Sequence, residues 1–337
     1  MLKNNNQFGM SLYQYFIYLS RYSRFNWDLG RRESWDETVT RYFDFFEKHL
    51  KKKHDFDLSP YRSELYNPIF NMEVVPSMRA LATAGPALER DNIAGYNCSA
   101  TPVDRITVFD EIMQISLNGC GVGFSVEQKF VDKLPSIADE FYEIEDIINV
   151  ADSKAGWSKS LRSLIGHLYI GQIPKWDVSK VRPAGSMLKT FGGRAAGPEP
   201  LVDLFNFAVT LFKKAAGRKL KPIECHDLIC RIGDAVVSGG YRRTALISLS
   251  DLGDYEMRNS KTGKWWEFNV HRALANNSAV YTQKPNIRTF MNEWIALYDS
   301  KSGERGIVNR KAFKLQAEKT GRRESDHDFL VNPCGVS

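Results

Sequence analysis

Apolar and aromatic residues recur at helical spacing over the first part of the chain, from residue 7 to about residue 55. Ser34 precedes the acidic pair Asp36 and Glu37, an arrangement typical of a helix N-cap followed by its first turn. The pattern predicts a helical region over residues 1–70. Two sets of residues in it lie on one helical face each: Tyr13, Phe16, Ile17 and Ser20, and then Tyr42, Phe45, Phe46 and His49.

From about residue 66 the pattern changes, because prolines and glycines become frequent and short strand-like segments alternate with helical ones. Such alternation predicts an α/β architecture for residues 71–337. The expected helices are 106–117, 201–216 and 287–298, and the expected strands are 119–126, 244–249 and 279–281.

Composition agrees with a packed globular protein, since 43% of the 337 residues are hydrophobic and 26% are charged. A net charge of +6 suits nucleotides but is too small for a nucleic-acid-binding surface. The sequence has neither an apolar run of about 18 residues nor a secretory leader. We therefore expect a cytoplasmic protein that binds neither membranes nor nucleic acids.

The five cysteines form an odd, scattered set, which argues against a disulfide framework. Cys225 and Cys230 lie in an apolar stretch, residues 223–237, that predicts a buried helix. A zinc site that includes His226 is the weaker alternative, so we expect no metal.

Three glycine-rich segments invite a functional interpretation. Residues 118–124 do not match a dinucleotide-binding fingerprint, because their glycines are spaced by two and a strand follows. They predict instead a slim backbone against which a ligand lies. Residues 181–198 combine glycines with Arg182, Lys189 and Arg194, which favours a phosphate-binding loop and a plain surface loop equally. Residues 238–243 favour structural anchoring.

The remaining cysteines have less ordinary surroundings. Cys98 follows Asn97 in a polar, strand-like stretch. Cys334 stands in the sequence Asn332-Pro333-Cys334-Gly335, where proline and glycine predict a tight loop. Either cysteine alone more often packs than reacts.

Taken in order, these segments resemble the ribonucleotide reductases, most closely the monomeric adenosylcobalamin-dependent class that reduces ribonucleoside triphosphates. The resemblance extends over nearly the whole chain. It rests on residues 21–25, 30–35, 76–79, 97–98, 121–124, 152–157, 192–198, 238–243, 276–281 and 332–335.

The resemblance implies the first half of a ten-stranded α/β barrel, cut after the cysteine of its central finger loop. Cys334 would carry the thiyl radical, generated through adenosylcobalamin, that takes hydrogen from C3′ of the ribose. Cys98 would be one of two cysteines that reduce C2′, with its partner downstream of the radical loop. Asn332 would hydrogen-bond the ribose, and Cys120 would only pack.

The resemblance also implies binding residues and partners. Ser77, Asn97 and Gly121 fall at substrate-site positions, and effector contacts are expected within residues 104–200. A deoxynucleotide effector and thioredoxin or a similar reductant would be the partners. The effector candidates are Asp104, Asp152, Lys154, Arg182 and Arg194.

Two departures from the family pattern stand out. Val336 occupies the position of the glutamate that serves as general base in relatives, a role that valine cannot fill. The sequence given also ends before the second half-barrel, the second reducing cysteine and most cobalamin contacts. We therefore expect no turnover from this chain alone and a possible complementary C-terminal fragment. The alternative is an inactive nucleotide-binding module.

Overall fold

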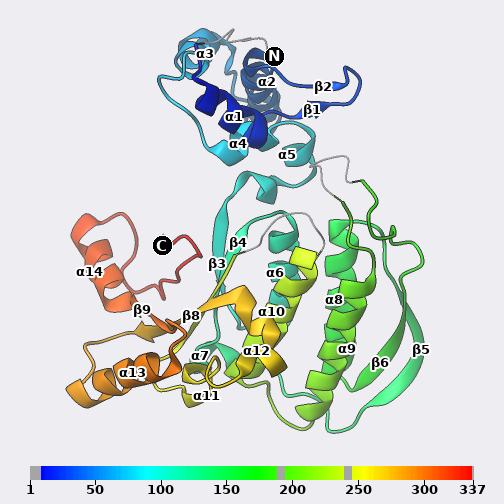
Figure 1. Ribbon diagram of the computed structural model, residues 1–337, viewed down its shortest axis with the longest axis vertical. Coiled ribbons are helices and arrows are strands. Elements are labelled where there is room, and N and C mark those ends of the chain that lie inside the picture. The colour runs from blue at the N-terminus through cyan, green and yellow to red at the C-terminus, as the bar shows by residue number, and fades with distance from the viewer. Residues whose placement is uncertain (1–8, 188–193, 239–244, 336–337) are drawn as a thin grey trace. The chain divides into compact units, whose positions relative to one another are not determined.

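The computed structural model describes residues 9–187, 194–238 and 245–335 (Figure 1). The chain divides into two compact units, Met1–Asn97 and Cys98–Ser337, which we call unit 1 and unit 2. The change of sequence pattern near residue 70 falls inside unit 1, between two of its helices.

Unit 1 is helical apart from a short antiparallel hairpin, β1 (Phe25–Asn26) and β2 (Arg31–Arg32). Ser34 caps the longest helix through a capping box with Glu37, which confirms the predicted N-cap. The helices are α1 (Leu12–Arg21), α2 (Trp35–His54), α3 (Arg62–Phe70), α4 (Met78–Thr83) and α5 (Pro86–Arg90), with 3-10 turns η1 (Ser59–Tyr61) and η2 (Asn92–Gly95). Their buried core includes Tyr18, Trp35, Val39, Phe43 and Leu81.

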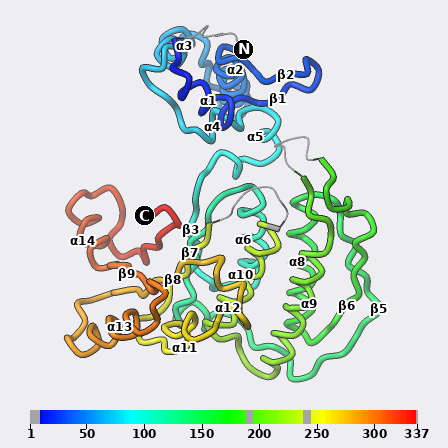
Figure 2. The backbone as a smooth tube through the Cα atoms, viewed as in Figure 1, coloured from blue at the N-terminus to red at the C-terminus, as the bar shows by residue number. Residues whose placement is uncertain are grey.

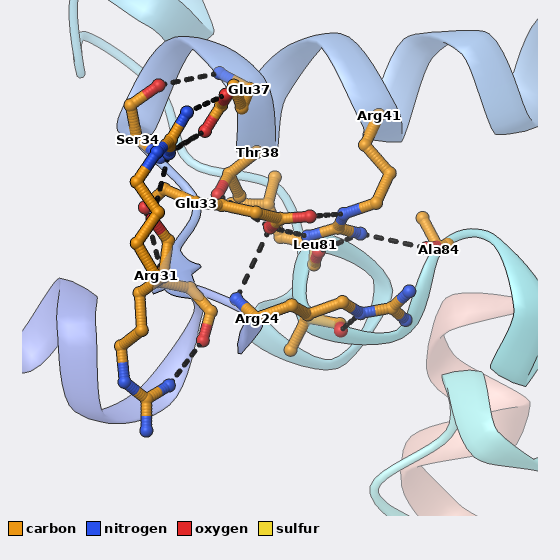
Figure 3. A network of polar contacts seen from close by, with 12 residues as sticks. Arg24, Arg31, Glu33, Ser34, Glu37, Thr38, Arg41, Leu81 and Ala84 are labelled. Carbon is orange, nitrogen blue, oxygen red and sulfur yellow. Dashed lines mark hydrogen bonds and ion pairs between the residues drawn. The ribbon is translucent and has the colours of Figure 1, made fainter. Parts of the chain in front are cut away.

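A half-buried ion pair, Glu33–Arg41, joins the elements of unit 1 (Figure 3). Arg41 Nε donates to Glu33 Oε1 at 2.8 Å, and Arg41 Nη1 donates to the carbonyl oxygens of Leu81 and Ala84 at 3.1 and 2.8 Å. Arg24 Nε donates to the carbonyl of Ala82 at 2.8 Å. Arg24 and Glu33, from the segment 21–35, thus have structural partners inside unit 1.

Unit 2 is built on a five-stranded parallel sheet of order β3-β4-β7-β8-β9. Its strands are β3 (Cys98–Pro102), β4 (Gly121–Ser125), β7 (Leu246–Asp251), β8 (Ala275–Tyr281) and β9 (Gly306–Asn309). The strands expected at 119–126, 244–249 and 279–281 are thereby confirmed, and the α/β architecture with them.

Long helices cover one side of this sheet, where α6 packs on β4 and α10 on β7 (Figure 1). The expected helices at 106–117 and 201–216 are confirmed, as is the buried helix around Cys225. The helices are α6 (Val108–Leu117), α8 (Lys154–Tyr169), α9 (Glu199–Lys214) and α10 (Pro222–Ser238). Beyond α8 lies a separate parallel pair, β5 (Tyr142–Asn149) and β6 (Gln172–Asp177).

The last part of unit 2 continues to the edge of the sheet formed by β9, and the chain then returns toward β3 and β4 (Figure 2). The expected helix at 287–298 is confirmed as α13. The remaining elements are α7 (Gln128–Val131), α11 (Tyr255–Arg258), α12 (Trp265–Phe268), η3 (Val270–Leu274), α13 (Ile287–Ser300) and α14 (Arg310–Thr320). None of the helices within the described ranges is both long and apolar enough to span a bilayer.

Candidate active site

Two thiols meet in unit 2 although 236 positions separate them along the chain. Cys98 is the first residue of β3 and is partly exposed, whereas Cys334 is exposed on the loop that follows α14. Their sulfur atoms lie 3.0 Å apart. The structure therefore brings together the two cysteines whose surroundings were unusual in the sequence.

A tight turn presents Cys334, as the proline and glycine around it predicted. The backbone N–H of Gly335 donates to the carbonyl of Asn332 at 2.9 Å, and Gly335 takes a positive φ of 72°. Asn332 Oδ1 accepts a hydrogen bond from the Cys334 backbone N–H at 3.0 Å. Asn332 thus fixes the orientation of Cys334 through the backbone. We call residues 329–335 the cysteine loop.

Glycines on β4 make room for the cysteine loop. Gly121 pairs in register with Cys98, and a Cβ added to Gly121 would lie 3.1 Å from Pro333 Cγ and 3.4 Å from Cys98 Sγ. A Cβ on Gly123 would lie only 1.8 Å from the carbonyl oxygen of Val331. At Gly123 the prediction of a backbone slimmed for a ligand is wrong, because this chain's own loop fills the space. A substrate contact at Gly121 stays a prediction.

The Cys98 thiol is held in its protonated form. Burial and, after it, the neighbouring Cys334 sulfur together raise the pKa of Cys98 to about 11. The protonated thiol keeps its S–H bond, and that bond is what allows it to donate a hydrogen atom.

A buried ion pair at the base of the cysteine loop was not anticipated from the sequence. Arg310, the first residue of α14, donates to both carboxylate oxygens of Glu127 at 2.7 and 2.6 Å. The two side chains are 1% and 2% exposed. Arg310 Nε also donates to the carbonyl of Phe329 at 2.9 Å, and Ser125 Oγ donates to Glu127 at 2.7 Å. The pair therefore connects the end of β4 to the start of the loop, and nothing in the local sequence signalled it.

The predicted substrate residues Ser77 and Asn97 lie in unit 1. Ser77 is exposed at the N-terminus of α4. Asn97 directly precedes Cys98, and its Oδ1 accepts a hydrogen bond from Arg79 Nε at 3.1 Å. Their roles toward a substrate stay predictions.

Among the predicted effector residues, Asp152 and Arg182 meet directly, with 2.7 Å between Asp152 Oδ2 and Arg182 Nε. Arg194 donates to the carbonyl of Gly185 at 2.9 Å, within the glycine-rich segment 181–198. Lys154 begins α8 and donates to Asn118 Oδ1 at 3.2 Å. Asp104 instead contacts Arg105 and Lys133, at 2.8 and 3.8 Å.

Residues 188–193, which include Lys189, lie outside the described residues, as do residues 239–244 and Val336.

The other three cysteines lie in the core. Cys120, Cys225 and Cys230 are fully buried, which confirms the packing role predicted for them. Cys230 Sγ lies 3.5 Å from His226 Nε2, and burial lowers the pKa of His226 to about 3.

Comparisons with known proteins match this chain to ribonucleotide reductases. The family model for the ribonucleotide reductase alpha domain matches residues 2–86, and the model for the insertion domain of B12-dependent ribonucleotide reductase matches residues 124–210. The chain belongs to the B12-dependent ribonucleotide reductase family. The second match covers β5, β6, α8 and most of α9, so the small parallel pair of this reductase-family chain lies within the region that the insertion-domain model matches.

Curated relatives are described as adenosylcobalamin-dependent ribonucleoside-triphosphate reductases. The one from Lacticaseibacillus paracasei is 27% identical over 94% of this chain and 51% of its own length. The one from Euglena gracilis is 30% identical over 79% of this chain and 39% of its own length. A third, from Dictyostelium discoideum and described as probable, is 27% identical over 98% of this chain and 48% of its own length. The reductase-family chain thus spans about half the length of the curated relatives it matches.

A solved structure described as a B12-dependent (class II) ribonucleotide reductase has the same fold. It superposes with a TM-score of 0.80 at 22% identity, over 95% of this chain and 53% of that one. The expectation of the first half of the reductase barrel is thereby confirmed for the described residues.

Proposed function

We propose that this chain supplies the radical cysteine and one reducing cysteine to the active site of a ribonucleoside-triphosphate reductase, an enzyme that makes deoxyribonucleotides for DNA synthesis. The observation that carries the proposal is the approach of Cys98 and Cys334 to 3.0 Å at the edge of the parallel sheet. Neither cysteine packs in the core as the other three do.

Each residue has a proposed part in the reaction. Cys334, exposed on its turn, takes a hydrogen atom from C3′ of the ribose as a thiyl radical. Cys98 donates hydrogen to C2′ in its protonated form, which its raised pKa of about 11 maintains at neutral pH. Asn332 orients Cys334 and hydrogen-bonds the ribose. Gly121 contacts the substrate from β4. Asn97 and Ser77 are the substrate-binding residues expected in unit 1.

The chemistry of the site fits adenosylcobalamin, because an exposed thiol is a hydrogen-atom donor that an organic radical can reach. When bound, the cofactor supplies that radical by homolysis of its cobalt–carbon bond. Cys334 is the residue of this chain that would face it. The turn that contains Asn332 and Gly335 keeps the thiol at a fixed place.

The proposal also assigns partners. A deoxynucleotide effector binds near the Asp152–Arg182 pair and Arg194, with Lys154 and Asp104 as further contacts. Thioredoxin or a similar dithiol restores the reduced cysteines. Free thiols of this kind require a reducing compartment, which we take to be the cytoplasm.

The test is an assay of the chain, alone and mixed with the polypeptide encoded directly downstream, with adenosylcobalamin, a dithiol and a ribonucleoside triphosphate. We expect no turnover from the chain alone. In the mixture we expect deoxyribonucleotide formation that Cys334→Ala and Cys98→Ala abolish, because each removes a hydrogen donor. Cys225→Ala, at a buried cysteine in α10, is the matched control and should retain turnover.

Two results would count against the proposal. Turnover that survives Cys334→Ala would mean that this thiol carries no radical. Binding of deoxynucleotides without turnover in any mixture would instead favour a nucleotide-binding module.

A further inference from the structure

The sulfurs of Cys98 and Cys334 lie in direct contact, 3.0 Å apart. The resemblance to reductases pairs Cys98 during turnover with a different cysteine, downstream of the radical loop, so turnover itself calls for no bond between Cys98 and Cys334. At 3.0 Å, the sulfurs are within reach of direct covalent bonding after a small movement of the cysteine loop.

We propose that Cys98 and Cys334 close a reversible disulfide, which stores the site in an inactive, protected state when the cell becomes oxidising. The inference rests on the proposed function for its consequence, since the disulfide removes both hydrogen donors at once. The bond itself depends only on the placement of the two sulfurs.

The oxidant is a low-molecular-weight disulfide such as glutathione disulfide. Cys334, which is exposed, loses its proton and attacks one sulfur of the oxidant, so that a mixed disulfide forms and one glutathione leaves as thiolate. Cys98 then loses its proton and attacks the Cys334 sulfur, which releases the second glutathione. Two protein thiols are oxidised, one glutathione disulfide is reduced to two thiols, and the two protons pass to the leaving thiolates.

The exposure of the Cys98 and Cys334 thiols makes oxidation selective for this pair. Cys334 is exposed and Cys98 is partly exposed, whereas the other three cysteines are fully buried. A dissolved oxidant therefore meets Cys334 first, and the Cys98 sulfur lies 3.0 Å from the sulfur it has modified.

The local backbone supports ring closure from both sides. Cys98 is fixed in register with Gly121 at the start of β3, and the Asn332 side chain holds the backbone N–H of Cys334. Gly121 leaves open the space between Pro333 and Cys98 Sγ. Both partners are thus held close before reaction, which raises their effective concentration.

The experiment incubates the full chain with glutathione disulfide and maps its cysteines by mass spectrometry without reduction. We expect a peptide containing Cys98 joined to one containing Cys334, reversible with dithiothreitol, while Cys120, Cys225 and Cys230 remain thiols. Cys98→Ser should stop at a mixed disulfide between Cys334 and glutathione, because the resolving thiol is gone.

A backbone variant tests the geometry. Gly121→Ala places a methyl group 3.1 Å from Pro333 and should slow ring closure about tenfold or more by displacing the loop. Gly166→Ala is the control, since a Cβ there meets nothing within 4 Å, and it should close at the wild-type rate.

The inference fails if wild-type protein accumulates glutathione on Cys334 while Cys98 stays a thiol, or if the buried cysteines oxidise equally fast. Mapping needs no turnover, so it is independent of the reductase proposal. If the disulfide forms in a protein that never shows turnover under reducing conditions, the proposed function fails and the redox pair stands.

Discussion

At the scale of single residues, Cys98 shows how position sets chemistry. Burial and the Cys334 sulfur raise its pKa to about 11 from the ordinary value of 9.0. The folded state therefore favours the neutral thiol. Its contribution to stability is fully present below pH 9 and is lost as the pH rises from about 9 through about 11.

The same shift predicts how Cys98 reacts with iodoacetamide. The rate of alkylation in the folded chain should rise about tenfold for each pH unit from 7.5 to 10, because the thiolate fraction keeps growing until the pH approaches the pKa. Peptide mass spectrometry measures it. The urea-unfolded chain is the control and should level off near pH 9; a plateau at the same pH in the folded chain would contradict the raised pKa.

At the scale of elements, the Glu127–Arg310 pair connects three segments that are separate in the sequence. It joins the turn after β4, the start of α14 and the carbonyl of Phe329 at the base of the cysteine loop. Because both side chains are buried, losing Glu127 leaves the Arg310 charge in the core with the Asp328 carboxylate, 3.8 Å away, as a more distant partner.

Glu127→Gln should therefore lower the free energy of unfolding by about 3–5 kcal/mol, as for other buried pairs that lose one partner. Urea unfolding followed by intrinsic fluorescence measures the change. The double variant Glu127→Gln/Arg310→Met should recover part of the loss, because it removes the stranded charge.

Glu145→Gln, at the exposed end of the Lys175–Glu145 pair, is the matched control and should leave the unfolding midpoint unchanged. A Glu127→Gln variant as stable as the wild type would show that the buried pair does not hold the loop.

At the scale of the whole molecule, much of the fold followed from the sequence. Helical periodicity located α6, α9 and α13, and Ser34 marked the start of α2, because these features depend on residues close in the chain. The meeting of Cys98 and Cys334 came only from the resemblance to reductases. The Glu127–Arg310 pair and the packing of Val331 against Gly123 were not predicted. Glycines in a strand indicate that something approaches its backbone closely, but they do not indicate which distant segment of the chain does so.

The division into two units predicts that a substitution which destabilises one unit leaves the stability of the other unchanged. Arg41→Met removes the partner of Glu33 and the donor to the carbonyls of Leu81 and Ala84, and it should destabilise unit 1 by about 2 kcal/mol. Hydrogen exchange should show lost protection in α2 and α4 and none in β4 and β7.

Lys48→Met, which breaks the exposed Lys48–Glu89 pair, is the control and should leave exchange unchanged in both units. Equal loss of protection in β4 after Arg41→Met would show that the two units open together.

The separation of 236 positions between Cys98 and Cys334 also sets the order in which the site can come into being. During synthesis at about 5–20 residues per second, Cys98 waits roughly 10 to 50 s before Cys334 is made. Over that time β4 is made without the Val331 carbonyl that packs against Gly123 in the finished chain. The paired thiols are therefore among the last features of unit 2 to form on the ribosome, and a chain with a seated cysteine loop is one whose sheet has already been assembled.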